Sequence, residues 1–204
     1  MSNIYDKLKS DFEKLKRKDK NLKIFGSECH KYIFNPILTE DYISSFENEH
    51  EISLPTDYRL FLKEVGNGGA GPYYGMFKLE DFYQSRLGDN SGINIGRNFL
   101  QTPFLYTIDN PFVNRDWDEN LTDEEYVKEC NKDISGTITL SHHGCGYFDM
   151  LIVSGEEKGK VWHDATISHC GMKRIFDSFT EWYCHWLKKS MKEYKKQTIS
   201  SVLY

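Results

Sequence analysis

Histidine and cysteine residues gather in the last third of the chain, and their types suggest two kinds of chemistry. They stand in three short segments: His142-His143-Gly144-Cys145, His163-Asp164 and His169-Cys170. Imidazole nitrogens and thiolates are ligands that zinc prefers, so a zinc site is one hypothesis. The spacing matches no common zinc pattern, however, and strand-end histidines and buried thiols explain the same residues. We therefore expect neither a metal ion nor a cofactor.

Cys145 and His163 are also the residue types of a nucleophilic pair, in which an imidazole turns a thiol into a thiolate. The sequence offers no third residue to orient the histidine and no loop to bind an oxyanion. The glycine-rich segment 66–71 follows a helix and lacks the Lys-Ser/Thr of a phosphate-binding loop. We therefore expect no catalytic residue and no enzymatic activity. A metal-dependent hydrolase built on the histidines remains as an alternative, ranked third after the two protein-binding functions described below.

Acidic residues crowd the middle of the chain, between residues 116 and 129. A solvated face is the plain interpretation. The functional hypothesis is a decoy for nucleic acid, because proteins that bind nucleic acid carry positive charge that an acidic surface attracts and covers. Exposed aromatic rings are common anchors of such interfaces. The candidate partner-binding residues are Asp116, Trp117, Asp118, Glu119, Asp123, Glu124 and Glu125, together with Tyr73 and Tyr74.

Composition narrows the class of protein. The 204 residues, 39 % of them hydrophobic, suit one domain with one core, so we expect a single domain over residues 1–204. A formal net charge of −5 argues against direct binding to nucleic acid, which normally requires a basic surface. Five cysteines form an odd set without CxxC pairs, and no apolar run suits a signal peptide or a membrane span. We expect reduced thiols, a cytoplasmic location and no membrane contact.

Apolar periodicity and capping signals predict the helices that must position these residues. Pro55 suits the first position of a helix, and Gly66, Gly68 and Gly69 end that helix. Ser178 and Glu181 have the spacing of a capping box, and the helix that they open is expected to pack on a sheet. The predicted helices cover residues 3–18, Thr39 through Phe46, Leu54–Val65, Asp123–Cys130 and the segment from Ser178 onward.

Short segments rich in β-branched and aromatic residues predict the strands. They are Gly75–Leu79, Thr137–Leu140, Gly146–Val153 and Lys160–His163. The last three are joined by short glycine-containing links, which indicates an antiparallel meander. Helices first, strands in the middle and a closing helix predict an α+β fold.

Four features together resemble the Smi/Knr-type branch of the SUKH superfamily. They are an N-terminal helix, the Leu54-Pro55-x-x-Tyr58-x-x-Phe61-Leu62 helix ending at Asn67-Gly68-Gly69, the Gly144-x-Gly146-x-Phe148 strand followed by Gly159-Lys160-Val161-Trp162, and the closing Phe179-x-x-Trp182 helix. The resemblance covers residues 38–187 and leaves an insert-like region, 84–133, poorly matched.

The resemblance implies a curved, mostly antiparallel sheet flanked by N-terminal helices and a C-terminal helix. It assigns scaffold roles to Pro55, Tyr58, Leu62, Gly144, Gly146 and Trp162. Many bacterial members look like immunity proteins of polymorphic or contact-dependent toxin systems. The expected partner is thus a cognate protein toxin, with a basic nuclease domain, bound by a monomer or weak dimer. The alternative is a regulatory or scaffold module of the same fold that binds an endogenous protein.

Overall fold

The structure is a computed structural model, and it describes residues 4–84, 96, 98–111, 121–168 and 170–202. A four-stranded antiparallel sheet in the order β1-β2-β3-β4 forms its centre. The strands are β1 (Thr137–Gly144), β2 (Tyr147–Ile152), β3 (Val161–Asp164) and β4 (Met172–Phe176). The helices are α1 (Ile4–Lys18), α2 (Ser27–His30), α3 (Glu40–Glu49), α4 (Thr56–Glu64), α5 (Asp123–Ile134) and α6 (Phe179–Val202), with short 3-10 turns η1 (Leu79–Asp81) and η2 (Thr166–Ser168).

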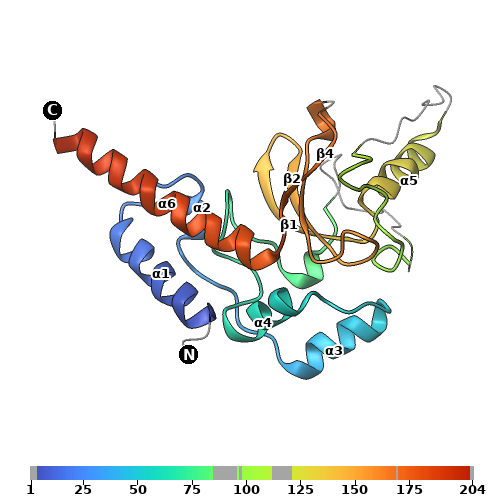
Figure 1. Ribbon diagram of the computed structural model, residues 1–204, viewed down its shortest axis with the longest axis horizontal. Helices are drawn as coiled ribbons and strands as arrows, with labels where there is room; N and C mark the ends of the chain where they lie inside the picture. The colour runs from blue at the N-terminus through green and yellow to red at the C-terminus, as the bar shows by residue number, and fades with distance from the viewer. Residues whose placement is uncertain (1–3, 85–95, 97, 112–120, 169, 203–204) are drawn as a thin grey trace.

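Most helices lie on one side of the sheet, and α5 lies on the other (Figure 1). The first four precede the sheet in the chain, α5 lies at the opposite side of the molecule from α1, and α6 runs from the sheet past α1. The predicted α+β fold is confirmed. Among the described residues, no helix combines the length and the apolar run that crossing a bilayer requires.

Helix α1 follows directly from the periodicity of its apolar residues. Tyr5, Leu8, Phe12 and Leu15 recur at three- and four-residue steps and are all buried, as expected of a helix with one face on the core. The hydroxyl of Tyr5 donates to the carbonyl of Asp57 in α4, 2.5 Å away. This contact fastens the first helix to the fourth.

Capping accounts for where α3 and α4 begin and end. The Thr39 hydroxyl accepts from the Tyr42 N–H at 3.2 Å, as predicted for an N-cap. Pro55 occupies the N-cap of α4, one position before the predicted one. Gly68 and Gly69 then adopt positive φ angles of 73° and 96°, which a right-handed helix does not contain, so the helix cannot continue through them.

The predicted strand pairs are confirmed as β1, β2 and β3, and β4 was not predicted. The strand predicted over Gly75–Leu79 is wrong, because only Met76 forms bridges, with Gly69 and Ser141. The side-chain oxygen of Asn67 accepts from the Leu79 N–H at 2.7 Å and turns the chain into η1. That hydrogen bond, from a side chain twelve residues earlier, occupies an N–H that a strand would use in its ladder.

Helix α6 begins at its predicted cap, and its first turns pack on the sheet as predicted. The Ser178 hydroxyl accepts from the Glu181 N–H at 3.1 Å, and the Glu181 carboxylate accepts from the Asp177 N–H at 3.2 Å. The helix contacts the sheet at β4, and it otherwise packs against α1 and α4. The long helix α6 therefore packs on the sheet at its start and also joins the sheet to α1 and α4.

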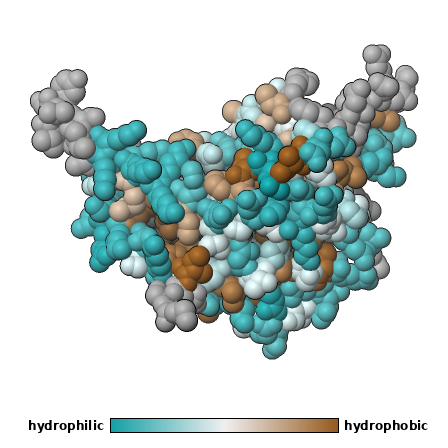
Figure 2. All heavy atoms as spheres, viewed as in Figure 1, coloured by the Kyte–Doolittle hydropathy of each residue, from teal (hydrophilic) through white to brown (hydrophobic). Residues whose placement is uncertain are grey.

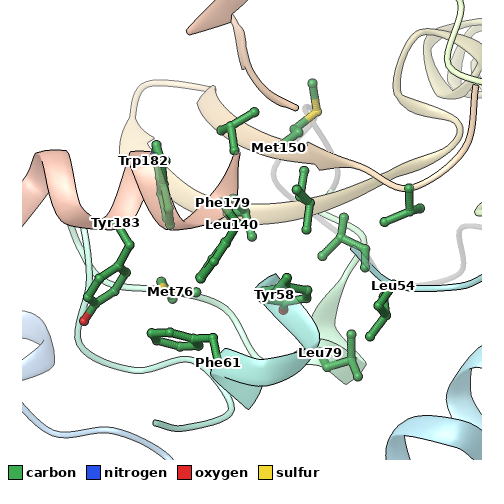
Figure 3. Packing of buried hydrophobic residues seen from close by; sticks show 14 of the residues in the cluster. Leu54, Tyr58, Phe61, Met76, Leu79, Leu140, Met150, Phe179, Trp182 and Tyr183 are labelled. Atoms are coloured by element: carbon green, nitrogen blue, oxygen red, sulfur yellow. The ribbon is translucent and has the colours of Figure 1, made fainter. Parts of the chain in front are cut away.

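Aromatic rings fill the junction between α4 and α6 (Figure 3). Phe179 lies 4.8 Å from Tyr58 and 5.0 Å from Phe61, measured between ring centroids, and Tyr183 lies 5.0 Å from Phe61. All four side chains are at most 1 % exposed. These contacts anchor the start of α6, which in turn places Trp182 over the sheet.

Candidate functional site

Three adjacent strands carry polar residues on one face of the sheet. Asp149 of β2 pairs directly with His163 of β3 and with Ser141 of β1. His143 lies two residues beyond Ser141, so its side chain points to the same face. A register shift between His142 and Gly144 leaves His143 without a direct partner, as in a β-bulge. His143, Asp149 and His163, here called the His-Asp-His cluster, therefore meet.

The carboxylate of Asp149 is the centre of this cluster. Its Oδ1 atom lies 2.9 Å from Nδ1 of His163 and 3.0 Å from Nε2 of His143. Its Oδ2 atom accepts from the indole Nε1–H of Trp182 in α6 at 2.8 Å. Although His143 Nε2 is near Oδ1, it is a buried atom without an aligned hydrogen bond. His143 Nε2 and Asp149 Oδ1 are therefore close to each other without forming a well-aligned hydrogen bond.

Charge around Asp149 decides its protonation. Burial by itself would raise the pKa of a carboxyl that is only 2 % exposed. The neighbouring His143 and His163 rings and the Trp182 N–H outweigh burial and hold the pKa of Asp149 below its usual value. Burial, with a smaller contribution from His143, also lowers the pKa of the neighbouring His142. A buried carboxylate thus remains ionised at the centre of the cluster.

The His-Asp-His cluster lines a cleft of about 560 Å³. The cleft lies between α6, the strands β3 and β4, and the loop that carries Tyr73. The cluster is accessible from it, because the side chains of His143 and His163 are 13 % and 22 % exposed. A small ligand or ion can therefore reach groups that the sheet and Trp182 otherwise enclose.

Three aromatic rings lie together beside this cleft, and two of them, Phe25 and Tyr73, line it. Tyr73 stacks on His143 with centroids 3.3 Å apart, while Phe25 lies 6.4 Å from Tyr73 and 5.3 Å from Tyr74. The exposed fractions of Phe25 and Tyr74 are 57 % and 42 %. We call Phe25, Tyr73 and Tyr74 the aromatic rim. The face drawn in Figure 2 is mostly hydrophilic, with apolar atoms at the surface between α1 and α6 and over the sheet.

The SMI1 / KNR4 family (SUKH-1) matches residues 37–185 of the chain. The chain belongs to this family. No curated protein and no solved structure matches it. The matched part of this SUKH-1 protein contains α3, α4, the whole sheet and the His-Asp-His cluster, whereas α1 lies before it and most of α6 after it. Tyr73 and Tyr74 lie inside the match, and Phe25 lies outside it.

The scaffold positions of this SUKH-1 protein have the geometry that the family resemblance implies. Gly144 and Gly146 adopt φ of 97° and 79° on either side of the turn between β1 and β2. Tyr58 and Leu62 are at most 1 % exposed, and Trp162 is fully buried with its Nε1 3.3 Å from a carboxylate oxygen of Glu157. These residues hold the sheet against the helices.

The structure brings together only part of the histidine and cysteine set. His143 and His163 meet, but His142 faces away and stacks on Phe148 at 4.9 Å. Cys145 and Cys170 are exposed, and neither forms a disulfide. His163 pairs with Asp149, and no hydrogen bond among the described residues joins it to Cys145. The hypothetical Cys145–His163 pair therefore receives no support.

Asp164, another predicted ligand, takes no part in the cluster. Asp164 is buried and accepts from the N–H and the hydroxyl of Thr166 at 3.0 Å and 2.6 Å. That arrangement caps the turn that leads into η2. His169 lies outside the described residues.

The predicted partner-binding residues divide into two regions. Asp116, Trp117, Asp118 and Glu119 lie outside the described residues, and of Asp123 and Glu124 only the backbone, in the first turn of α5, is described. Glu125 is exposed and forms a capping box with Thr122, so it has a structural role of its own. Helix α5 ends just before β1, and Tyr74 faces Gly144 where β1 ends. The eight residues of β1, about 25 Å in length, lie between the end of α5 and the position of Tyr74, and Asp123, Glu124 and Glu125 stand at the other end of α5.

Asp149 is the functional residue that sequence reasoning missed. It stands in the apolar segment Tyr147-Phe148-Asp149-Met150-Leu151-Ile152. A carboxylate within such a buried strand requires partners, because burying an isolated charge is very costly. A single acidic residue within an apolar strand was therefore the feature of the sequence that could have identified this site. The partners of Asp149 come from β1, β3 and α6.

Proposed function

We propose that this SUKH-1 protein is a non-catalytic immunity protein that binds a cognate toxin and neutralises it by covering its active surface. Membership of the family supports the proposal, since the resemblance implies this role for many bacterial members. We also propose that it acts in the cytoplasm, as one domain whose region 84–133 is an insert. No bond-making step is assigned to it.

The aromatic rim is the observation that carries the proposal. Phe25 and Tyr74 expose more than two fifths of their surface next to each other, yet stacking of Tyr73 on His143 holds the group in place. Rigid aromatic side chains bury a large area and lose little conformational entropy on binding. The rim therefore suits an interface anchor.

The acidic segment contributes the second part of the proposed surface. Carboxylates from residues 116–125 would attract a basic nuclease face and increase its association rate. A standard interface contains about 20 to 30 residues on each partner, so one toxin domain can reach both the rim and α5. A nuclease that meets only one region would still be inhibited if that region covers its nucleic-acid site.

The direct test is co-expression with the C-terminal toxin domain encoded by the neighbouring gene. We expect the full chain to restore growth and to co-purify with the domain. If the neighbouring domain is toxic and the chain gives neither protection nor a complex, the proposal is wrong.

Variants with matched exposure locate the interface. Tyr74→Ala should weaken toxin binding by about tenfold or more, which corresponds to about 1.4 kcal/mol. Tyr42→Ala is the control, because Tyr42 of α3 is 44 % exposed against 42 % for Tyr74 and lies outside the rim. Equal effects of the two substitutions would exclude the rim as an anchor.

Neutralising variants test the acidic part separately. The triple variant Asp123→Asn, Glu124→Gln, Glu125→Gln keeps the capping box, since glutamine also serves at its third position. We expect slower association at low salt and little change at high salt. The control removes three exposed carboxylates elsewhere, at Glu13, Glu49 and Glu156. Unchanged association rates of the triple variant would exclude this part.

The alternative is a regulatory or scaffold module that binds an endogenous protein through the same rim. A gene without an adjacent toxin gene, together with an endogenous protein whose binding depends on Tyr74, would favour it.

A further inference from the structure

We propose that the His-Asp-His cluster binds one divalent transition-metal ion, with zinc as the preferred ion. The ligands are Nε2 of His143, Oδ1 of Asp149 and Nδ1 of His163. The cleft supplies the remaining coordination position to solvent or to an external ligand. The inference is independent of toxin binding, because it concerns a property of the isolated chain.

The distances suit a shared ion. One ligand atom from each residue lies within 4.8 Å of the other two, and the Asp149 oxygen lies 2.9 Å and 3.0 Å from the two nitrogens. Bonds of about 2.0 to 2.1 Å around tetrahedral zinc place its ligands roughly 3.3 Å apart. Two of the three separations are thus already close to this value, and the third, at most 4.8 Å, can reach it by an adjustment of His143. His143 stands at a bulge beside a turn, where such an adjustment is easiest.

The unsatisfied atom of His143 supports the same conclusion. Its Nε2 is buried and lacks an aligned hydrogen bond, although a carboxylate oxygen is 3.0 Å away. Buried polar atoms are rarely left without a partner, and each exception requires an explanation. An ion between the three ligand atoms would give this nitrogen a partner and would compensate the negative charge of Asp149.

The surroundings resemble those of an organised metal centre. The Trp182 indole holds Asp149 Oδ2 at 2.8 Å and thereby aims Oδ1 at the two imidazoles. Tyr73 covers His143 by stacking. Outer partners of this kind orient metal ligands and increase affinity. The ligands come from three strands of a rigid sheet, so little conformational entropy is lost on binding.

The donor set selects the class of metal. Two imidazoles and one carboxylate suit zinc and neighbouring transition metals, whereas calcium and magnesium prefer sites made of oxygen alone. Three protein ligands with an open fourth position are also typical of exchangeable zinc. We therefore expect zinc and cobalt to bind and magnesium not to bind.

The experiment measures metal binding by the full chain without an affinity tag. After removal of metal with a chelator, titration with zinc should give about one equivalent bound, and cobalt should give the intense visible absorption of a four-coordinate site. Zinc at about 100-fold its dissociation constant should raise Tm by about 5 to 10 °C. Failure to bind either metal would overturn the proposal.

Neighbouring histidines supply the matched control. His163→Gln should reduce affinity at least about 100-fold, since loss of even an outer partner costs about 10- to 100-fold. His142→Gln should keep the stoichiometry and affinity, because His142 faces Phe148. An equal loss in the two variants, or full binding by His163→Gln, would contradict the assignment.

A nitrogen-resolved NMR spectrum covers the case in which a variant folds poorly. In the unmodified chain, zinc should shift Nε2 of His143 and Nδ1 of His163 and leave the nitrogens of His142 in place. Shifts confined to His142 or to other histidines would refute the site.

Discussion

The hydrogen bond from Trp182 to Asp149 should stabilise the fold by more than the packing of the indole alone. The indole Nε1 lies 2.8 Å from Oδ2 of Asp149, and both side chains are only 2 % exposed. A hydrogen bond to a charged group contributes about 1.5 to 3 kcal/mol. Trp182→Phe also removes part of a buried ring, which costs about 1 kcal/mol more. We expect the substitution to lower the free energy of unfolding by about 2.5 to 4 kcal/mol.

Urea unfolding monitored by circular dichroism, at neutral pH with a chelator present, measures this loss. Trp186→Phe is the control, since Trp186 lies one turn later in α6 and is 8 % exposed. It packs on His30 and Tyr183, and no hydrogen bond from its indole is found among the described residues. This control should cost only about 1 kcal/mol, the packing contribution.

A double-mutant cycle isolates the pairwise energy. Asp149→Leu removes the acceptor without leaving a large cavity, and the double variant should lose about 1.5 to 3 kcal/mol less than the sum of the single variants. A coupling energy below about 0.5 kcal/mol, or equal losses for Trp182→Phe and Trp186→Phe, would refute the reasoning. If a substitution changes the slope of the unfolding free energy against urea concentration, it has instead altered the compactness of the native or the unfolded state.

Two further predictions concern pH and backbone conformation. Burial lowers the pKa of His30 to about 4, so only the unfolded chain takes up this proton between about pH 6.5 and 4. The free energy of unfolding should therefore fall by about 3 kcal/mol as the pH drops through that window. His30→Leu should flatten the dependence of this free energy on pH. If the variant and the unmodified chain show the same pH dependence, the prediction is wrong. Gly69→Ala should lower stability by about 3 kcal/mol or more, because φ is 96° and a Cβ would lie 2.5 Å from the Ile33 carbonyl oxygen. Gly159→Ala is the control, because Gly159 has a φ of 88° but a Cβ there would meet no atom within 4 Å, and it should cost only about 1 kcal/mol. Thermal unfolding measures both losses. Equal losses would show that the clash with the Ile33 carbonyl oxygen does not contribute.

Local sequence signals account for most of the secondary structure. Thr39, Thr122 and Ser178 each cap a helix through a hydrogen bond to a residue three positions later. Such bonds depend on near neighbours, so the chain encodes them locally. The predictions failed where a distant partner decided the outcome. Met76 bridges to Gly69 and Ser141 instead of extending a strand, and β4 exists because it pairs with β3.

The candidate site shows the same division. The pattern of histidines identified His143 and His163 as ligand types, but it also included His142, which stacks on Phe148, and the exposed Cys145 and Cys170. Strand register decides between His142 and His143, because neighbouring residues of a strand point to opposite faces. Asp149, the centre of the cluster, became apparent only when β1, β3 and α6 surrounded it.

The sequence by itself determined the described α-helices except the short α2, three strands of the sheet and the family, because capping, periodicity and motif order act over short ranges. Only the tertiary structure decided which polar groups share a space, how Trp182 of α6 reaches a carboxylate 33 residues away, and how Phe25 joins Tyr73 and Tyr74. Those contacts join residues far apart in the chain, and their positions follow from strand register and helix packing, which no local pattern encodes.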